Sequence, residues 1–326
     1  MKKLFFLPVL FFFGQLSFAQ GISKADLKIL EQKEDSIRSY SVKIIQGINA
    51  SDRLDADSMF TRLLVRALKI KNSFNYPFES LQTISVQCSP DSVFRIFTWQ
   101  LVINENVIRQ HGAIQMKTAD GSLKLYGLID KSDVTTNVVD TVGDQFGWIG
   151  AIYYKIILKK NGEHNFYTLL GFDENNIRSS RKIIEVLRFN DKGPVFGGPY
   201  FTGEGNNGFP RSQSRYIMEF KKEAGPRLSY DKDLDMIIAE HLVSESSEPQ
   251  KKWTLVGDGD YEGFQWAGGK WVHVNKVFNV VTPEGKEPVP NPIRDASGNL
   301  DEKKLKGAEE EEVKPAPVKP RPKGKG

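Results

Sequence analysis

The sequence KIILKKNGEHNFYTLL, residues 155–170, predicts a β-hairpin. Asn161-Gly162 lies between two apolar runs, and both residue types tolerate the positive φ that a type I′ turn requires. The pairs Asp120-Gly121 and Gly268-Gly269 separate β-rich runs in the same way. We therefore expect antiparallel strands joined by tight turns at several places in the chain.

Alternation of apolar and polar residues extends on both sides of this hairpin, from about residue 81 to residue 280. Many short antiparallel hairpins are typical of a sandwich, a barrel or a propeller-like body, and not of a parallel α/β sheet. The predicted fold class is therefore α+β, mainly antiparallel β. The β-rich runs lie at residues 84–88, 93–103, 113–116, 123–129, 151–158, 166–172, 182–189, 216–220, 236–242 and 271–280.

Two helices are predicted ahead of the β-rich region, over residues 23–48 and 51–70, because apolar residues recur there at helical spacing. An apolar helix face must be buried, so we expect this helical hairpin to pack on the β body. The apolar positions are Leu27, Leu30, Ile37, Ile44, Ile45 and Ile48 in the first helix, and Ala56, Met59, Phe60, Leu63, Leu64, Ala67 and Leu68 in the second.

The first 20 residues, MKKLFFLPVLFFFGQLSFAQ, have the pattern of a signal peptide. Two lysines precede an apolar run too short to span a bilayer, and Ser17-Phe18-Ala19 supplies the small residues that signal peptidase needs. We expect the mature protein to begin near Gln20, in the periplasm or outside the cell. Because Gln20 stands where a lipidated cysteine would be and no second long apolar run follows, we expect neither a lipoprotein nor a transmembrane segment after cleavage.

From residue 283 the sequence is rich in Pro, Lys, Glu and Gly and holds no aromatic residue. Such a segment cannot bury enough apolar surface to fold, so a disordered tail is expected over residues 283–326. Its end, KPAPVKPRPKGKG, carries five cations and no anion. The tail is either an inert solubilising segment or an arm that contacts an anionic surface, such as lipid headgroups or cell-wall polymer. The other predicted divisions are a signal peptide (1–19), a helical hairpin (20–75) and an antiparallel β domain (76–282).

Charge is balanced over the part of the chain that is expected to fold. The chain carries 45 Lys and Arg and 41 Asp and Glu. The leader and the tail together contain twelve of the basic and nine of the acidic residues, which leaves 33 basic and 32 acidic residues in the part expected to fold. Nucleic-acid binding usually requires a basic face, and this balance gives no support for one. The only cysteine, Cys88, excludes an intramolecular disulfide. It is expected to be a buried free thiol.

The sequence establishes no motif for a cofactor, a metal ion or a catalytic nucleophile. Residues 203–208 match GxGxxG, but Phe209-Pro210 follows instead of the helix that would meet a pyrophosphate. The turn at 258–263, DGDYEG, resembles the start of a calcium loop but lacks the acidic twelfth residue and the flanking helices. We interpret it as an acidic surface turn, with an irregular calcium site as the alternative. GxSxG is absent, and no zinc-site spacing joins the histidines at positions 111, 164, 241 and 273.

Two aromatic segments are candidate contact surfaces. The loop 197–215, GGPYFTGEGNNGFPRSQSR, is long, and long loops without regular structure are functional or mobile. If Gly268-Gly269 is a two-residue turn, Trp266 lies opposite Trp271 on one side of the ribbon. Exposed aromatic rings of this kind stack on sugars, but a cross-strand tryptophan pair can equally seal the edge of a β core. The candidate contact residues are Tyr200, Phe201, Phe209, Tyr261, Phe264, Trp266, Trp271 and His273.

Three stretches carry a resemblance to known proteins: the leader ending in SFAQ, LLGFDENNIRSSRKIIEVLRF at 169–189, and DGDYEGFQWAGGKWVHV at 258–274. Over roughly residues 80–275 the chain resembles secreted proteins of the Bacteroidetes that carry no assigned function. The resemblance implies export and a β-rich body, and it brings no catalytic residue with it. The tail has no folded sorting domain of the kind some of these bacteria use for secretion, which favours the periplasm.

The leading hypothesis is an exported, non-catalytic binding or scaffold module of the cell envelope, whose partner is a glycan, peptidoglycan or another envelope protein. The alternative is a secreted hydrolase that acts on glycans or peptides through carboxylates brought together by the fold. Asp173, Glu174 and Glu219 are candidates for such carboxylates, although spacing alone does not pair them. A third hypothesis is an envelope protein whose tail binds peptidoglycan or lipid headgroups.

Overall fold

The computed structural model describes residues 21–203 and 209–278. They belong to one unit that ends at Phe278. The predicted signal peptide, the predicted tail and residues 204–208 of the GxGxxG match lie outside the described residues. Within the described part of the chain, no helix is long and apolar enough to span a membrane.

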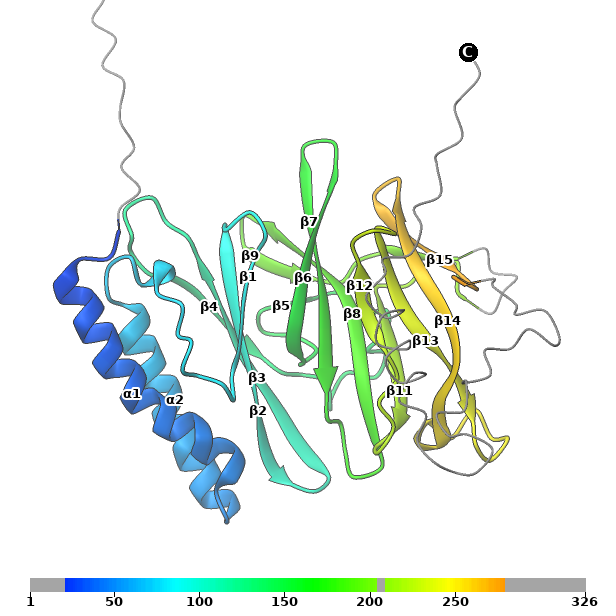
Figure 1. Ribbon diagram of the computed structural model, residues 1–326, viewed down its shortest axis with the longest axis horizontal. Coiled ribbons are helices and arrows are strands. Elements are labelled where there is room, and N and C mark those ends of the chain that lie inside the picture. The colour runs from blue at the N-terminus through cyan, green and yellow to red at the C-terminus, as the bar shows by residue number, and fades with distance from the viewer. Residues whose placement is uncertain (1–20, 204–208, 279–326) are drawn as a thin grey trace, which may run out of the picture. The chain divides into compact units, whose positions relative to one another are not determined.

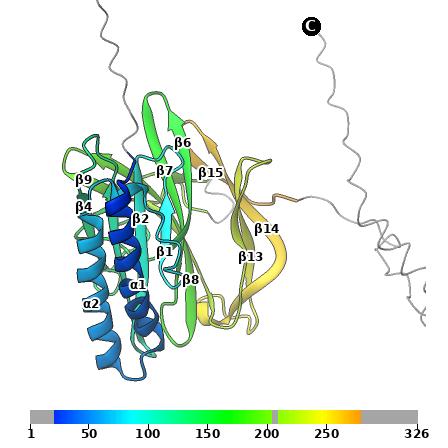
Figure 2. The same ribbon diagram turned by 60° about the vertical axis from the view of Figure 1, so that its left-hand side comes forward.

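The two predicted helices are confirmed as α1 (Lys24–Gln46) and α2 (Ala50–Leu68). Ser23 begins α1, because its hydroxyl accepts a hydrogen bond from the backbone N–H of Asp26 at 3.0 Å. Figure 2 shows the two helices side by side over the first sheet. Most predicted apolar positions face this sheet, but Leu27, Ile45 and Ile48 are exposed, so the buried face of α1 is narrower than predicted.

The first sheet has the antiparallel order β1-β2-β3-β4. Its apolar residues pack on both faces. One face contacts the helices through Phe97, Trp99 and Leu101, and the other contacts the second sheet through Phe94 and Ile96. The strands are β1 (Ser85–Cys88), β2 (Phe94–Asn104), β3 (Val107–Met116) and β4 (Lys124–Ile129), and the short 3-10 helix η1 (Ser73–Asn75) precedes them.

The second sheet contains the hairpin that the sequence predicted, formed by β6 and β7. Its tight turn is shifted by one residue, since Asn161 pairs with His164 and the turn is Gly162-Glu163. Gly162 has φ +58°, the position at which a type II′ turn favours glycine. The strands are β5 (Gly143–Asp144), β6 (Ile152–Asn161), β7 (His164–Asp173), β8 (Ser179–Asn190) and β9 (Gly193–Phe196), in the order β5-β9-β8-β7-β6, with β11 (Arg215–Lys221) paired to β8.

The third sheet has the order β10-β15-β14-β13-β12. It is antiparallel except for the short parallel pair of β10 and β15. Gly268 and Gly269 both have positive φ and join β14 to β15, so the predicted two-residue turn is confirmed. The strands are β10 (Phe201–Thr202), β12 (Leu228–Asp231), β13 (Met236–Ser244), β14 (Leu255–Ala267) and β15 (Lys270–Val274), and the 3-10 helix η2 (Lys252–Thr254) precedes β14.

Three apolar clusters lie between successive layers: helices on first sheet, first sheet on second, and second sheet on third. Figure 1 shows the layers in this order along the chain, from the blue helices to the yellow and orange strands. The α+β class with a helical hairpin on an antiparallel β body is thus confirmed. Among the architectures left open by the sequence, a sandwich extended to three stacked sheets is the one observed.

Candidate functional site

A polar cleft of about 400 Å³ opens where the first and second sheets meet. Three segments that are far apart in the sequence build it: the β2–β3 hairpin, the connection after β4, and the β7–β8 hairpin. Charged and amide side chains dominate its lining. The lining residues are Asn106, Val107, Ile108, Arg109, Asp130, Ser132, Asp133, Asp173, Asn175, Asn176 and Arg181. We call this site the polar cleft.

Asp130 is held in the polar cleft by four hydrogen bonds from three segments. Its Oδ1 accepts from the backbone N–H of Ser132 at 2.9 Å, from the Ser132 hydroxyl and from the backbone N–H of Gly150 at 3.1 Å. Its Oδ2 accepts from the backbone N–H of Gln110 at 3.1 Å. These donors occupy the lone pairs that a general base would use, so Asp130 has the environment of a fixed, orienting carboxylate.

Asp173, the last residue of β7, is the second carboxylate of the polar cleft and, unlike the partly buried Asp130, it is buried. Its Oδ1 accepts hydrogen bonds from Gln110 Nε2 at 2.9 Å and from the backbone N–H of Asn175 at 3.0 Å. Gln110 therefore contacts both carboxylates. Burial raises the pKa of Asp173 above its usual range, against the opposing effects of these hydrogen bonds and of Arg181.

Two arginines stand in the polar cleft, and each is paired with an acid. Arg109 NH1 lies 2.8 Å from Asp133 Oδ2, and Arg181 Nε lies 3.0 Å from Glu219 Oε2. Both pairs are partly exposed, so the guanidinium groups keep donor positions that a ligand can reach. The polar cleft thus offers planar donors, amides and carboxylates within one small volume.

The loop between β7 and β8 shapes one wall of the polar cleft through local turns. Asn175 has φ +55°, a conformation that Asn tolerates better than most residues. The side-chain oxygen of Asn176 accepts hydrogen bonds from the backbone N–H groups of Arg178 and Ser179. These turns explain why the sequence DENNIRSS forms a defined wall and not a loose connection.

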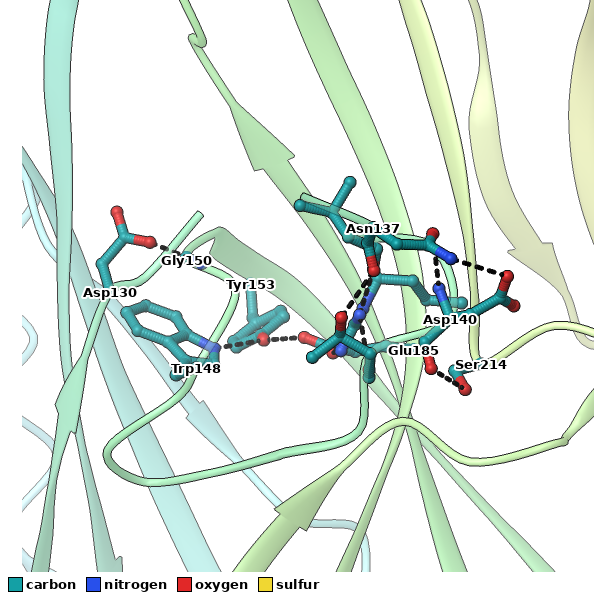
Figure 3. A network of polar contacts seen from close by, with 11 residues as sticks. Asp130, Asn137, Asp140, Trp148, Gly150, Tyr153, Glu185 and Ser214 are labelled. Atoms are coloured by element: carbon teal, nitrogen blue, oxygen red, sulfur yellow. Dashed lines mark hydrogen bonds and ion pairs between the residues drawn. The ribbon is translucent and has the colours of Figure 1, made fainter. Parts of the chain in front are cut away.

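A buried network holds the long connection between β4 and β6, which carries Asp130 and Asp133 (Figure 3). Glu185 on β8 and Arg215 on β11 are both fully buried, and Arg215 NH2 lies 3.1 Å from Glu185 Oε2. Arg215 NH1 also donates to the carbonyl oxygens of Val138 and Thr141, at 2.8 Å for Thr141. The ion pair therefore fixes the middle of the connection to the second sheet. We call this group, with Tyr153 and Trp148, the buried network.

Tyr153 and Trp148 extend the buried network toward the polar cleft. Trp148 Nε1 donates to the Tyr153 hydroxyl at 2.7 Å, and that hydroxyl donates to Glu185 Oε1. Just beyond Trp148, Gly150 approaches so closely that an added Cβ would lie 2.7 Å from Asp130 Cγ. Glycine is required there, and the buried network thereby sets the place of Asp130 (Figure 3).

The predicted aromatic contact surface is largely part of the core. The predicted register is confirmed: Trp266 faces Trp271 with ring centroids 5.3 Å apart, and Phe264 faces His273. Phe201, Phe264 and Trp271 are fully buried and Phe209 is nearly so, which corrects the expectation that a ligand contacts them. The physical reason is that β14 and β15 press this side against the second sheet. Tyr200, Tyr261 and Trp266 remain partly exposed.

His273, the remaining residue of that set, joins a buried acid–base contact. Its Nε2 lies 2.8 Å from Glu262 Oε2, while the Tyr216 hydroxyl hydrogen-bonds Glu262 Oε1 at 2.5 Å. Burial tends to raise the pKa of Glu262, but these two partners outweigh it and lower the pKa. The ring of Phe209 stacks on His273 at 4.5 Å. This contact fastens the loop end to the third sheet.

Other predicted residues are dispersed over the fold. Of the three candidate carboxylates, Asp173 lines the polar cleft, Glu219 holds Arg181, and Glu174 pairs with Lys222 at 2.9 Å. Cys88 is exposed, contrary to expectation, because it ends the edge strand β1. The expected acidic turn at 258–263 is wrong, because these residues lie within strand β14, where Asp258 contacts His241 at 2.8 Å. No group of three or more metal-ligating side chains occurs among residues 21–203 and 209–278.

Gln110, Asp130 and Arg109 were not identified from the sequence. The contacts that join them to the other residues of the polar cleft are made with segments 20 or more residues away in the sequence. The only available signal was Asp130-Lys-Ser132 directly after the apolar run of β4, a position at which side-chain–backbone turns are common.

The chain matches no protein-family model, no curated protein and no solved structure.

Proposed function

We propose that this chain is a non-catalytic binding module of the cell envelope and that its polar cleft binds a glycan, with peptidoglycan as the partner. The observation that carries the proposal is the lining of the polar cleft. The buried carboxylate of Asp173, the partly buried carboxylate of Asp130, two arginines and three asparagines meet there in a volume suited to a small ligand. Sugars present many hydroxyl groups that both donate and accept hydrogen bonds, and such a mixed set of donors and acceptors complements them.

The fixed state of the side chains supports binding over catalysis. Asp130 is saturated by internal donors, and the arginines are paired. Preorganised groups of this kind lose little conformational entropy when a ligand arrives. The envelope location rests on the predicted signal peptide and on the resemblance to secreted proteins, both of which remain predictions.

The test is retention of the purified chain on insoluble peptidoglycan sacculi. We expect Arg109→Ala and Asn176→Ala to lose most of the retention, because both residues line the polar cleft. Lys221→Ala is the matched control, since Lys221 is an equally exposed cation with its own acidic partner, Glu245, and it does not line the polar cleft. Wild-type retention by both cleft variants would rule the polar cleft out as the binding site.

A secreted glycan hydrolase is the second candidate, favoured by the raised pKa of Asp173 beside Asp130. A buried carboxyl with a raised pKa next to a second carboxylate is the arrangement that glycosidases use as general acid and partner. The two functions separate in a reducing-end assay on the same sacculi. A hydrolase releases new reducing ends and loses that activity in Asp173→Asn, whereas a binding module releases none.

A further inference from the structure

A second hollow, of about 560 Å³, adjoins the polar cleft. The two share Arg109 and Asp130 as lining residues, so they meet at these two side chains. The second hollow lies along β3 and β4 and reaches Thr61 of α2 on one side and Phe146 on the other. We call it the aromatic hollow. Each volume falls within the range of small-molecule sites, so together they offer more room than one sugar residue fills.

The aromatic hollow differs from the polar cleft in its lining. Tyr126, Ile129 and Phe146 give it an apolar surface, and Phe146 is 59% exposed. Gly127 forms an open part of its wall, because an added Cβ would meet no heavy atom within 4 Å. Sugar rings carry an apolar C–H face beside their hydroxyl groups, so a glycan can use both kinds of lining in turn.

Unused acceptors accompany this apolar surface. Gln110 Oε1 and Gln145 Oε1 are buried and have no hydrogen-bond partner among the described residues. Both residues are among those that line the aromatic hollow, and Gln110 is 1% exposed. A buried acceptor without a donor costs free energy unless a water or a ligand supplies one. A hydroxyl or an acetamido N–H of a sugar is a donor of the required kind.

His111 adds an oriented group to the aromatic hollow. Its Nδ1 lies 3.0 Å from Asp57 Oδ1, which also accepts a hydrogen bond from Trp99 Nε1 at 2.7 Å. Because a carboxylate oxygen accepts, Nδ1 carries the hydrogen, and Nε2 is left for a partner outside this contact. Asp57 is a buried residue of α2, so the His111 ring is held in one orientation.

We infer that the ligand is an extended oligosaccharide that crosses from the polar cleft over Arg109 and Asp130 into the aromatic hollow. The inference rests on the proposed function and specifies its ligand: a linear glycan chain and not a single sugar or a short fragment. The polar cleft binds hydroxyl-rich edges, and the aromatic hollow binds a ring face together with an N–H or O–H donor.

The test compares two soluble probes by titration calorimetry: the N-acetylglucosaminyl–N-acetylmuramic acid disaccharide and the octasaccharide with the same repeat. We expect the wild type to bind the octasaccharide about tenfold or more tightly than the disaccharide. Gly127→Leu fills the aromatic hollow and is expected to reduce the octasaccharide affinity to that of the disaccharide, while the disaccharide affinity stays the same. Gly225→Leu is the matched control, because Gly225 also has open space at its Cβ and does not line either site.

Phe146→Ser provides a second variant should Gly127→Leu fail to fold, since it removes an exposed ring without adding volume. It is expected to give the same loss for the octasaccharide alone. Equal affinities of the wild type for both probes, or an unchanged octasaccharide affinity in Gly127→Leu and Phe146→Ser, would overturn the inference. Loss of both probes in Gly127→Leu would also overturn it, by placing the whole ligand in the aromatic hollow. The proposed function would stand in the first two cases if Arg109→Ala abolishes disaccharide binding, whereas a wild type that binds neither probe contradicts both.

Discussion

The buried network and the polar cleft both combine carboxylates with guanidinium groups at the junction of the first and second sheets, yet they differ in access. Glu185 and Arg215 are 0% exposed, whereas the side chains of Arg109 and Asp133 are 37% and 49% exposed. In the buried network Arg215 donates hydrogen bonds to Glu185 and to backbone carbonyl oxygens. Next to the polar cleft Gln110 keeps an unpaired acceptor.

This difference in exposure separates the polar groups that stabilise the fold from those that remain accessible at the surface. Breaking a fully buried ion pair is costly, because it leaves a buried charge without a partner. A partly exposed pair contributes little stability, because water competes for the same hydrogen bonds. The buried network therefore positions the residues of the polar cleft, and the polar cleft holds the polar groups that remain accessible.

The largest effect is expected from Glu185→Gln. The substitution leaves the buried Arg215 guanidinium without a counter-charge, and we expect a loss of about 3–5 kcal/mol in the free energy of unfolding. Urea denaturation measures it. Glu245→Gln, which breaks the exposed pair with Lys221, is the matched control and is expected to cost about 0–1 kcal/mol. Similar losses of unfolding free energy in the two variants would contradict the distinction between the buried ion pair and the exposed one.

An intermediate effect is expected from Asp130→Ala. The substitution removes the acceptor of the partly buried Gln110, Ser132 and Gly150 N–H groups. We expect a loss of about 1–2 kcal/mol in the free energy of unfolding, since a fully buried donor without a partner costs about 1–3 kcal/mol. Urea denaturation again provides the measurement, with Asp133→Ala as the control on the exposed side of the polar cleft. Should Asp130→Ala be no less stable than Asp133→Ala, Asp130 would not be the fixed carboxylate described above.

Asp173→Asn tests the polar cleft through its pH dependence. The pKa of Asp173 is raised in the folded chain, so the unfolded chain releases this proton at a lower pH, and the wild type loses stability as the pH rises between the two pKa values. The stability of Asp173→Asn relative to the wild type should therefore increase from about pH 4 toward neutral pH. Denaturation at a series of pH values measures this slope.

Asp120→Asn is the matched control for that slope. Hydrogen bonds from Ser122 lower the pKa of Asp120, so the wild type gains stability as the pH rises and the variant should fall behind it. The two variants are thus expected to show slopes of opposite sign. A flat or falling difference for Asp173→Asn would contradict the raised pKa.

The smallest effect on stability is expected from Arg109→Ala, which removes only a partly exposed ion pair. We expect a change of about 0–1 kcal/mol in the free energy of unfolding, although retention on peptidoglycan is lost. Thermal unfolding together with the retention assay checks both statements. A large loss of stability would place Arg109 with the buried network instead.

Several parts of the fold were predictable because they depend on neighbours in the sequence. Helical periodicity gave both helices, and Gly268-Gly269 gave the register of Trp266 against Trp271. Asn161-Gly162 gave a hairpin but not its turn, because Gly162 alone adopts a positive φ there. Asp173 was one of three carboxylates between which the sequence could not choose.

The sequence by itself determined the periodicity of the strands, the positions of the turns and the side of a ribbon that two residues share, because these follow from backbone geometry over a few residues. The tertiary structure decided which side is covered. Trp271 is buried because the second sheet lies against it, and Asp130 and Asp173 share a cleft because Gln110 lies between them. Burial and pairing arise from contacts between residues 20 to 103 positions apart, so no local sequence pattern predicts them.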